Sequence, residues 1–213
     1  MCLFDAYFFD FDGTVGDTAP DIRSSWLLAI EKLQLPTENF QTNFRIGPSI
    51  SETAALLYPQ YPEKHLELQN AYKHYYDEIN TYSGTTPYPG LPEAIKMLHS
   101  NGKKVYIVTN KRLMPLTKLM KIFALTPYCS GIFVPDILET GMHITKNELA
   151  ALALRVSGVS GERALMIGDT EIDIAAGRYA GMKTCAVSWG YGKLSVLQQA
   201  QPDYQIDSID ELP

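Results

Sequence analysis

The sequence predicts an α/β protein: a Rossmann-like core with a parallel sheet, and a helical cap domain inserted after the first strand. From residue 88 onward, short apolar runs alternate with helical patterns. Such alternation is typical of parallel strands joined by right-handed helical crossovers. A single earlier apolar run, residues 6–9, is separated from them by a stretch, residues 17–82, that shows helical patterns and no strand pattern. The first strand is therefore expected to join a sheet whose other strands follow a long insert.

The first strand is expected over residues 6–9, an apolar and aromatic run that ends abruptly in a polar loop. The insert begins with apolar residues at spacings of three and four over residues 20–35, which indicate a helix. Two further helical patterns cover residues 51–57 and 63–79. These elements make up the expected cap.

The joints are expected at residues 15–18 and 83–90, which are rich in Gly, Pro, Ser and Thr. Insertions are tolerated where the entry and exit points of the chain lie close together. We therefore divide the sequence into a core of residues 1–15 and 88–213 and a cap of residues 16–87.

The remainder of the core is expected to alternate regularly between helices and strands. The helices are predicted over residues 93–100, 116–123, 146–156 and 172–180, and the strands over residues 104–109, 131–134, 164–167 and 183–187.

Charge and cysteine content limit the partners and the compartment. The net charge is −6, which disfavours nucleic acid and anionic membrane surfaces because both require a basic face. The three cysteines show no paired spacing, so we expect reduced thiols and neither a disulfide framework nor a zinc cluster. The N-terminal apolar stretch is interrupted by acids and lacks a basic leader. We expect a cytoplasmic protein with no membrane partner.

Polar residues follow the expected strands, where ligands bind in open parallel sheets. Asp10 and Asp12 follow the first strand, and Thr109 and Asn110 lie at the end of the second strand. Lys146 lies at the start of a helix. Asp169 and Asp173 follow the fourth core strand. Any one of these residues is more often a turn, cap or surface residue than a ligand. Their joint placement at one sheet edge predicts a functional site.

These residue types suit phosphate chemistry. Mg²⁺ favours a few carboxylates together with water and phosphate oxygens, and Asp10, Asp12 and Asp169 supply carboxylates. Thr109, Asn110 and Lys146 can donate hydrogen bonds or charge to a bound phosphate. Phosphoryl transfer mainly requires positioning and charge neutralisation, so the sequence predicts a phosphoryl-transfer site.

Two capping-box spacings place polar groups at the start of helices. Thr145 and Glu148 have this spacing, which puts Lys146 in a first helical turn. Thr170 and Asp173 have the same spacing. Asp173 is therefore expected one turn into its helix, where it could brace Lys146 or a metal-bound water.

With these positions assembled, the chain closely resembles the haloacid dehalogenase-like hydrolase superfamily. The likeness covers nearly the whole chain and all four motifs, which here read DFDGT at 10–14, VTN at 108–110, Lys146, and GDTEID at 168–173. Within the superfamily it looks most like the phosphoglycolate phosphatase branch. That likeness rests on RIGPSISETAALL at 45–57, WGYG at 189–192 and PDY at 202–204. One departure is Lys146-Asn147, where the family often has Lys-Pro; this bears on the subfamily more than on activity.

The resemblance implies a role for each matched position. Asp10 would be the nucleophile that forms an aspartyl-phosphate and also a Mg²⁺ ligand, and Asp12 the general acid and base, binding Mg²⁺ through its main-chain carbonyl. Thr109, Asn110 and Lys146 would bind the substrate phosphate. Asp169 would ligate Mg²⁺, and Asp173 would support the metal site or Lys146.

The acid at position 12 distinguishes between the reactions of the superfamily. A dehalogenase needs no proton donor for its leaving group, whereas phosphate monoester hydrolysis does. An Asp at this position fits phosphate monoester hydrolysis or phosphosugar mutase chemistry. The likeness to the phosphoglycolate phosphatase branch implies a phosphoric monoester hydrolase that acts on a small phosphorylated metabolite resembling phosphoglycolate. Alternatives are a nucleotidase or pyrophosphatase, a phosphosugar mutase like β-phosphoglucomutase, and a non-catalytic binder of a phosphorylated ligand.

The cap is expected to face the part of the substrate beyond its phosphate. Arg45, in the loop at residues 45–50, is the expected cap contact to the substrate, with a plain surface arginine as the equal alternative. The sequence leaves open whether the protein is a monomer or a homodimer.

Overall fold

A computed structural model describes residues 3–136 and 144–213. The chain divides into two compact units, one of residues 1–17 and 87–213 and one of residues 18–86. The first unit contains a six-stranded sheet in the order β5-β4-β1-β6-β7-β8, and every adjacent pair in it is parallel. In sequence order the strands are β1 (Ala6–Phe9), β4 (Lys104–Val108), β5 (Gly131–Phe133), β6 (Ala164–Gly168), β7 (Lys183–Val187) and β8 (Tyr204–Ile206).

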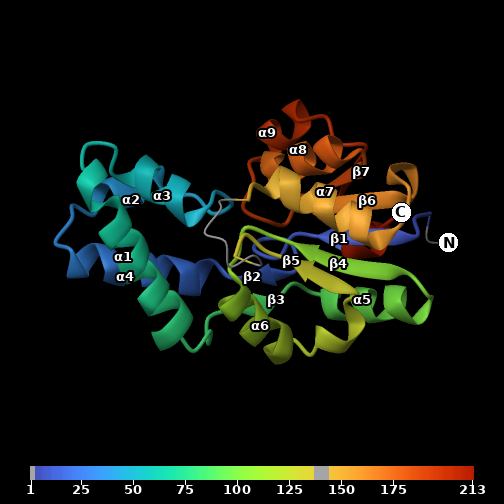
Figure 1. Ribbon diagram of the computed structural model, residues 1–213, viewed down its shortest axis with the longest axis horizontal. Coiled ribbons are helices and arrows are strands. Elements are labelled where there is room, and N and C mark those ends of the chain that lie inside the picture. The colour runs from blue at the N-terminus through green and yellow to red at the C-terminus, as the bar shows by residue number, and fades with distance from the viewer. Residues whose placement is uncertain (1–2, 137–143) are drawn as a thin grey trace. The chain divides into compact units, whose positions relative to one another are not determined.

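Helices lie on both faces of this sheet. Figure 1 shows α7 (Lys146–Ser157) and α8 (Glu171–Ala180) on one side of the strands and α5 (Leu91–Ser100) and α6 (Leu113–Ile122) on the other. A short helix, α9 (Leu194–Gln199), follows β7. This is the doubly covered arrangement that a parallel sheet needs, since its strands are apolar on both faces.

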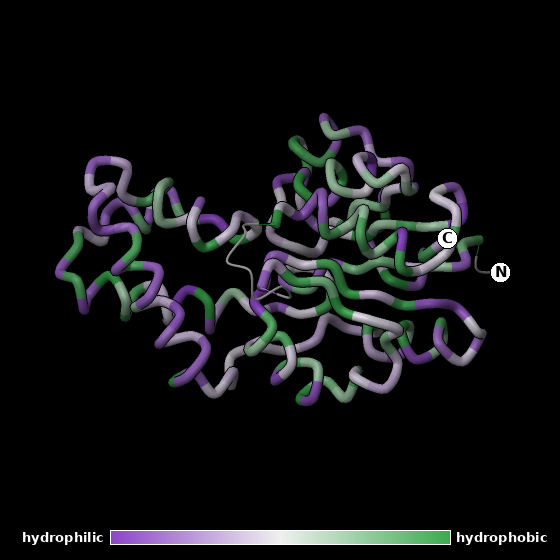
Figure 2. Tube along the Cα trace, in the orientation of Figure 1, coloured by the Kyte–Doolittle hydropathy of each residue, from purple (hydrophilic) through white to green (hydrophobic). Residues whose placement is uncertain are grey.

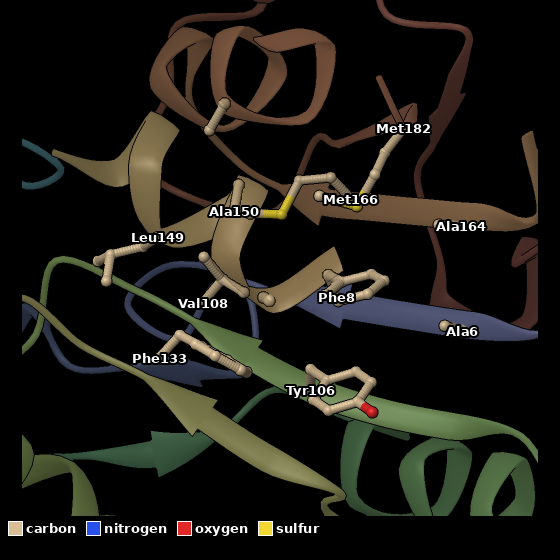
Figure 3. Packing of buried hydrophobic residues seen from close by; sticks show 12 residues of the cluster. Ala6, Phe8, Tyr106, Val108, Phe133, Leu149, Ala150, Ala164, Met166 and Met182 are labelled. Carbon is tan, nitrogen blue, oxygen red and sulfur yellow. The ribbon is translucent and has the colours of Figure 1, made fainter. Parts of the chain in front are cut away.

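One hydrophobic cluster lies between the sheet and α7 and also includes Ala176 of α8. Ala6 and Phe8 are two residues apart along β1, so their side chains point to the same face of the sheet. Figure 3 shows Phe8 beside Tyr106 of β4, with Leu149 and Ala150 of α7 facing these strands. The rings of Phe8 and Tyr106 stack with centroids 5.0 Å apart. Because all four residues of β1 are buried, this strand is fixed by packing on both sides.

The chain leaves and re-enters the core through two short strands, β2 (Gly16–Asp17) and β3 (Thr86–Pro87), which pair with each other. The Tyr88 N–H donates a hydrogen bond to the Val15 carbonyl at 3.0 Å. Entry and exit therefore lie side by side, which is the geometry that an insertion requires.

The insert is helical. It contains α1 (Ala19–Lys32), α2 (Glu38–Asn43), α3 (Ile50–Leu57) and α4 (His65–Lys73), and α4 continues as a π-helical turn over His74–Ile79. Purple and green alternate along these helices in Figure 2, as expected for helices with one apolar face. Trp26 stacks on Tyr72 at 4.2 Å between ring centroids, and Tyr72 stacks on Tyr76 at 5.4 Å. These aromatic rings form the interior of the insert.

The predicted fold class is confirmed: a parallel-sheet core with a helical insert after β1. The sequence predicted no strand after residues 183–187, but the structure contains β8, which extends the sheet at its edge. The helices α2 and α9 and the π-helical turn were also not predicted. Over the described residues, the structure contains no helix with the length and apolar character needed to cross a membrane.

Candidate active site

Three strand ends meet at one edge of the core sheet. β1 lies between β4 and β6, and Phe9 is in register with Ile107 of β4 and Ile167 of β6. The Asp10 N–H continues this ladder by donating to the Ile167 carbonyl at 2.9 Å. The residues that follow β1, β4 and β6 therefore emerge next to each other, as expected for carboxyl ends of parallel strands.

A tight loop after β1 separates the two aspartates that follow the strand. The Phe11 carbonyl accepts hydrogen bonds from the N–H groups of Thr14, Val15 and Gly16, at 3.3, 3.0 and 3.0 Å. Gly13 has φ of +85° in the left-handed region, which glycine adopts at little cost. A Cβ atom at Gly13 would overlap the carboxylate of Asp169. The loop therefore needs glycine for both its backbone conformation and its close approach.

Three buried carboxylates converge behind this loop. Side-chain oxygens of Asp10, Asp169 and Asp173 all lie within 4.8 Å of one another. Lys146 Nζ lies 2.7 Å from Asp10 Oδ1 and 2.5 Å from Asp173 Oδ1, although neither oxygen has a well-aligned hydrogen-bond donor among the described residues. The cluster thus combines three carboxylates with one ammonium group.

Hydrogen bonds fix two of the three carboxylates. Asp169 Oδ1 accepts from the Thr14 hydroxyl at 3.1 Å, and its Oδ2 accepts from the Tyr191 N–H at 2.7 Å. Asp173 Oδ2 accepts from the N–H and the hydroxyl of Thr170, at 2.9 and 2.8 Å. The second of these arrangements is the predicted cap of α8, and it leaves Asp173 Oδ1 directed at Lys146.

The predicted capping box at the start of α7 is present. Glu148 N–H donates to the Thr145 hydroxyl at 3.3 Å, and Thr145 N–H donates to Glu148 Oε2 at 2.8 Å. Thr145 is the N-cap residue, so the helix begins at Lys146. The lysine consequently lies in the first turn, and its side chain is 5% exposed.

Burial dominates the electrostatics of the cluster. Desolvation raises the pKa of Asp10 to about 6, with Lys146 opposing the shift and Asp173 reinforcing it. Desolvation also raises the pKa of Asp169 well above its usual range, reinforced by Asp173 and Asp10. Burial lowers the pKa of Lys146, but the carboxylates of Asp10 and Asp173 outweigh that effect and raise it on balance. Negative charge here is therefore in excess of what one lysine neutralises.

The donor set fits a hard divalent cation. Mg²⁺ prefers carboxylate oxygens and an incomplete protein shell that leaves room for water and phosphate. Two buried oxygens, Asp10 Oδ1 and Asp173 Oδ1, lie beside the Lys146 ammonium group but have no well-aligned hydrogen-bond donor among the described residues. A cation bound among Asp10, Asp169 and Asp173 would offset the charge that Lys146 leaves uncompensated. The cluster can therefore bind a metal ion.

The remaining predicted residues are placed as follows. Thr109 is buried and Asn110 half-buried directly after β4, at the same sheet edge as Asp10. Asp12 does not join the carboxylate cluster; its Oδ1 lies 2.7 Å from Lys111 Nζ instead. Arg45 is exposed and belongs to the helical insert, so its contact with substrate stays a prediction.

Three contributing residues were not identified from the sequence. Lys111 directly follows the VTN motif, and this position next to the motif is the only feature of the sequence that could have indicated a role for it. Thr14 lies within the DFDGT string, which by itself does not indicate a role for it. Tyr191 lies in the WGYG segment and reaches two acids, donating its N–H to Asp169 and its hydroxyl to Asp17 at 2.8 Å. No spacing rule predicts that contact.

We expect Gly13→Ala to destabilise the core more than Gly102→Ala does. Both glycines have positive φ, +85° and +72°, so alanine should incur a similar backbone strain of about 1–2 kcal/mol at each. Only at Gly13 does the new Cβ overlap neighbouring atoms, whereas at Gly102 it meets nothing within 4 Å. The overlap should add about 1–3 kcal/mol. Urea denaturation of both variants measures the difference, and equal losses would refute a close approach at Gly13.

The raised pKa of Asp10 predicts a pH dependence of stability in the absence of metal. The folded chain, with a pKa of about 6 at this group, binds more protons than the unfolded chain, whose value is 3.8. This contribution to the free energy of unfolding is therefore complete below 3.8 and is lost as the pH rises through about 6. Compared with Asp10→Asn, the wild-type chain should lose stability over that interval in urea denaturation with a chelator present. Parallel pH profiles of the two proteins would contradict the expectation.

A comparison with protein families agrees with this geometry. Residues 7–187 match the model of the family described as haloacid dehalogenase-like hydrolase. The matched range runs from β1 through β7 and so includes every residue of the carboxylate cluster. The chain belongs to this family.

Individual relatives cover nearly the whole chain. A phosphoglycolate phosphatase of Aquifex aeolicus is 32% identical over 210 residues, covering 96% of this chain and 92% of the relative. Pyrophosphatase PpaX of Halalkalibacterium halodurans is 30% identical over 207 residues, covering 96% and 93%. The crystal structure of a predicted phosphatase from Clostridium acetobutylicum superposes with a TM-score of 0.87 at 24% identity, covering 99% and 96%. The last likeness concerns the fold alone.

Proposed function

We propose that the chain is a Mg²⁺-dependent phosphatase that hydrolyses a small phosphate monoester through an aspartyl-phosphate on Asp10. One observation carries the proposal. Asp10 directly follows the central strand β1, is buried within a cluster of three carboxylates, and lies 2.7 Å from the ammonium group of Lys146. A carboxylate in that setting can attack phosphorus while neighbouring groups neutralise the phosphate oxygens.

In the first half-reaction a carboxylate oxygen of Asp10 attacks the phosphorus atom in line with the leaving group. The phosphorus–oxygen bond to the leaving alcohol breaks as the bond to Asp10 forms. Asp12 gives a proton to the leaving oxygen, since an alkoxide leaves poorly without one. Thr109, Asn110 and Lys146 hold the phosphate oxygens during the transfer.

In the second half-reaction Asp12 accepts a proton from a water molecule as the water oxygen attacks the phosphorus. The bond between phosphorus and Asp10 breaks, and inorganic phosphate leaves. The same carboxyl group is therefore acid first and base second, which returns the site to its starting protonation state.

In this proposal Asp10, Asp169 and the main-chain carbonyl of Asp12 would hold the metal ion, with Asp173 in support. The chemistry that Mg²⁺ supplies when bound is neutralisation of charge on the phosphate oxygens and the carboxylates. Because the cluster has more carboxylates than ammonium groups, we expect a cation to be needed to neutralise the remaining negative charge. Thr14 and Tyr191 keep Asp169 oriented for this task through their hydrogen bonds.

The substrate we propose is a metabolite resembling phosphoglycolate. A relative of that name is 32% identical to this chain. A pyrophosphatase is similar at 30%, so inorganic pyrophosphate is the second candidate. Specificity in such enzymes depends on the shape of the site beyond the phosphate, and Arg45 of the insert is our proposed contact there.

Phosphate release from a panel of substrates tests this proposal. The panel contains 2-phosphoglycolate, pyrophosphate, a nucleoside monophosphate and phenyl phosphate, each with Mg²⁺ and with a chelator. We expect Mg²⁺-stimulated release, greatest from 2-phosphoglycolate. A separate reaction contains β-glucose 1-phosphate and a bisphosphate primer. Isomerised sugar phosphate there would favour a mutase, and no release from any compound would favour a non-catalytic binder.

A further inference from the structure

A buried lysine that the proposed mechanism does not use lies beside Asp12. The side chain of Lys111 is 2% exposed, and its Nζ lies 2.7 Å from Asp12 Oδ1. Burying an ammonium group is unfavourable unless an opposite charge compensates it. Asp12 supplies that charge from the loop after β1, while Lys111 comes from the turn after the neighbouring strand β4.

The turn that carries Lys111 is itself fixed. The Lys111 N–H donates to the Thr109 hydroxyl oxygen at 3.2 Å, and the Thr109 N–H donates to the Phe133 carbonyl at 3.1 Å. Lys111 Nζ also lies 5.9 Å from the centre of the Phe11 ring. The lysine therefore approaches Asp12 from a backbone held by β4 and β5, over a ring that belongs to the same loop as Asp12.

The two partners differ in accessibility. The Asp12 side chain is 15% exposed, against 2% for Lys111. A ligand that enters the site can thus reach the carboxyl group more easily than the ammonium group behind it. This difference favours a role of Lys111 through Asp12 over direct contact of Lys111 with the substrate.

We propose that Lys111 is a positioning residue that holds Asp12 for proton transfer, an inference that rests on the proposed role of Asp12. Nζ donates to Oδ1, so the transferred proton is carried by Oδ2. The proton moves from Oδ2 to the leaving oxygen as the phosphorus–oxygen bond breaks and the bond between phosphorus and Asp10 forms. In the second half-reaction Oδ2 accepts a proton from the attacking water.

Leaving groups of different basicity separate this role from a structural one. Phenolate is strongly basic and leaves faster when it is protonated, whereas dinitrophenolate leaves well without a proton. Loss of a correctly held Asp12 should therefore slow the cleavage of phenyl phosphate far more than that of dinitrophenyl phosphate. General damage to the fold should slow both reactions alike.

The experiment compares kcat/KM for these two substrates in Lys111→Met and in Asp12→Asn, with Mg²⁺ present. Asp12→Asn calibrates the effect of losing the acid. We expect Lys111→Met to slow phenyl phosphate by about 100-fold and dinitrophenyl phosphate by less than about 10-fold, within the range attributed to general acid catalysis. Lys121→Met is the control, because Lys121 is an exposed lysine of the nearby helix α6 and should change neither value.

A double-mutant cycle completes the test. If Lys111 acts through Asp12, adding Lys111→Met to Asp12→Asn should slow phenyl phosphate little further, because residues that act as a unit are non-additive. Lys111→Gln keeps a hydrogen-bond donor on a similar side chain, so its kcat/KM for phenyl phosphate should lie between the values of wild type and Lys111→Met. If Lys111→Met does not fold, Lys111→Gln takes its place in the comparison of the two substrates.

Two outcomes overturn different claims. Equal slowing of both substrates by the Lys111 variants, or additive losses in the double mutant, would refute the positioning role while leaving the proposed function intact. If Asp12→Asn slows both substrates equally, the assignment of Asp12 as the acid fails and the inference fails with it.

Discussion

Replacing the carboxyl group of Asp10 by an amide, in Asp10→Asn, is expected to lower kcat for phosphate release by about four orders of magnitude or more. Removal of an enzyme's nucleophile has effects of that size, because the remaining groups cannot supply the missing bond. Asparagine has nearly the same shape as aspartate, and its amide nitrogen is a poor nucleophile. The residual rate should come from binding and charge neutralisation alone.

The fold of Asp10→Asn should be retained. Burial already raises the pKa of Asp10 to about 6, so the charged form is unfavourable in the metal-free core. The substitution also removes one of three mutually repelling carboxylates. We therefore expect unchanged circular dichroism and no loss of thermal stability in the presence of a chelator.

Asp207→Asn is the matched control for this variant. Asp207 also follows a strand of the core sheet, β8 (Tyr204–Ile206), but it is exposed and lies at the sheet's edge. Wild-type turnover is expected for it under the same conditions. If Asp10→Asn retains turnover close to that of Asp207→Asn, Asp10 is not the nucleophile.

The second large effect is expected on stability. Lys146→Met removes the ammonium group that lies 2.7 Å from Asp10 and 2.5 Å from Asp173, and leaves buried carboxylates facing each other. Breaking a buried pair by removing one partner is destabilising by about 3–5 kcal/mol. For a chain of this length that loss corresponds to a fall in Tm of about 6–20 °C.

Lys183→Met provides a control for Lys146→Met. Lys183 pairs with Asp203 at 3.0 Å, but the two side chains are 47% and 32% exposed, and exposed pairs contribute about 0–1 kcal/mol. Added Mg²⁺ should restore part of the stability of Lys146→Met, since a cation can replace the missing charge. Thermal unfolding with and without Mg²⁺ measures both effects. Similar losses of stability in the two lysine variants would contradict the claim that Lys146 balances the charge of a buried carboxylate cluster.

The order of the main core elements could be predicted because each leaves a strong local pattern. The apolar run at residues 6–9 ends in acids, and β1 is buried along its whole length. By contrast, β8 has three residues and only Ile206 is buried. Such a short, partly exposed edge strand lacks the apolar run that identifies a central one. The π-helical turn at residues 74–79 continues a helical pattern and could not be distinguished from α-helix by its spacing.

For the candidate site, the sequence identified which residues gather at the sheet edge and suggested the contact between Asp173 and Lys146, but it did not separate the partners of Asp10 from those of Asp12. Asp10 and Asp12 are two residues apart, and nothing in that spacing says that one joins Asp169 and the other meets Lys111. β1 ends at Phe9, and Asp12 lies in a loop whose turns converge on the Phe11 carbonyl, so the strand's alternation does not govern its side chain. The contact of Tyr191 with Asp169 depends in turn on where a loop after β7 returns to the site.

Chemical trapping during turnover tests the central claim, that Asp10 forms a covalent bond to phosphorus. Borohydride reduces an acyl phosphate and converts the aspartate that carries it to homoserine, which mass spectrometry locates in the sequence. If Asp10 is the nucleophile, we expect homoserine at position 10 when substrate and Mg²⁺ are both present, and none in Asp10→Asn. Active enzyme that yields no homoserine at position 10, or yields it at position 169, would contradict the account.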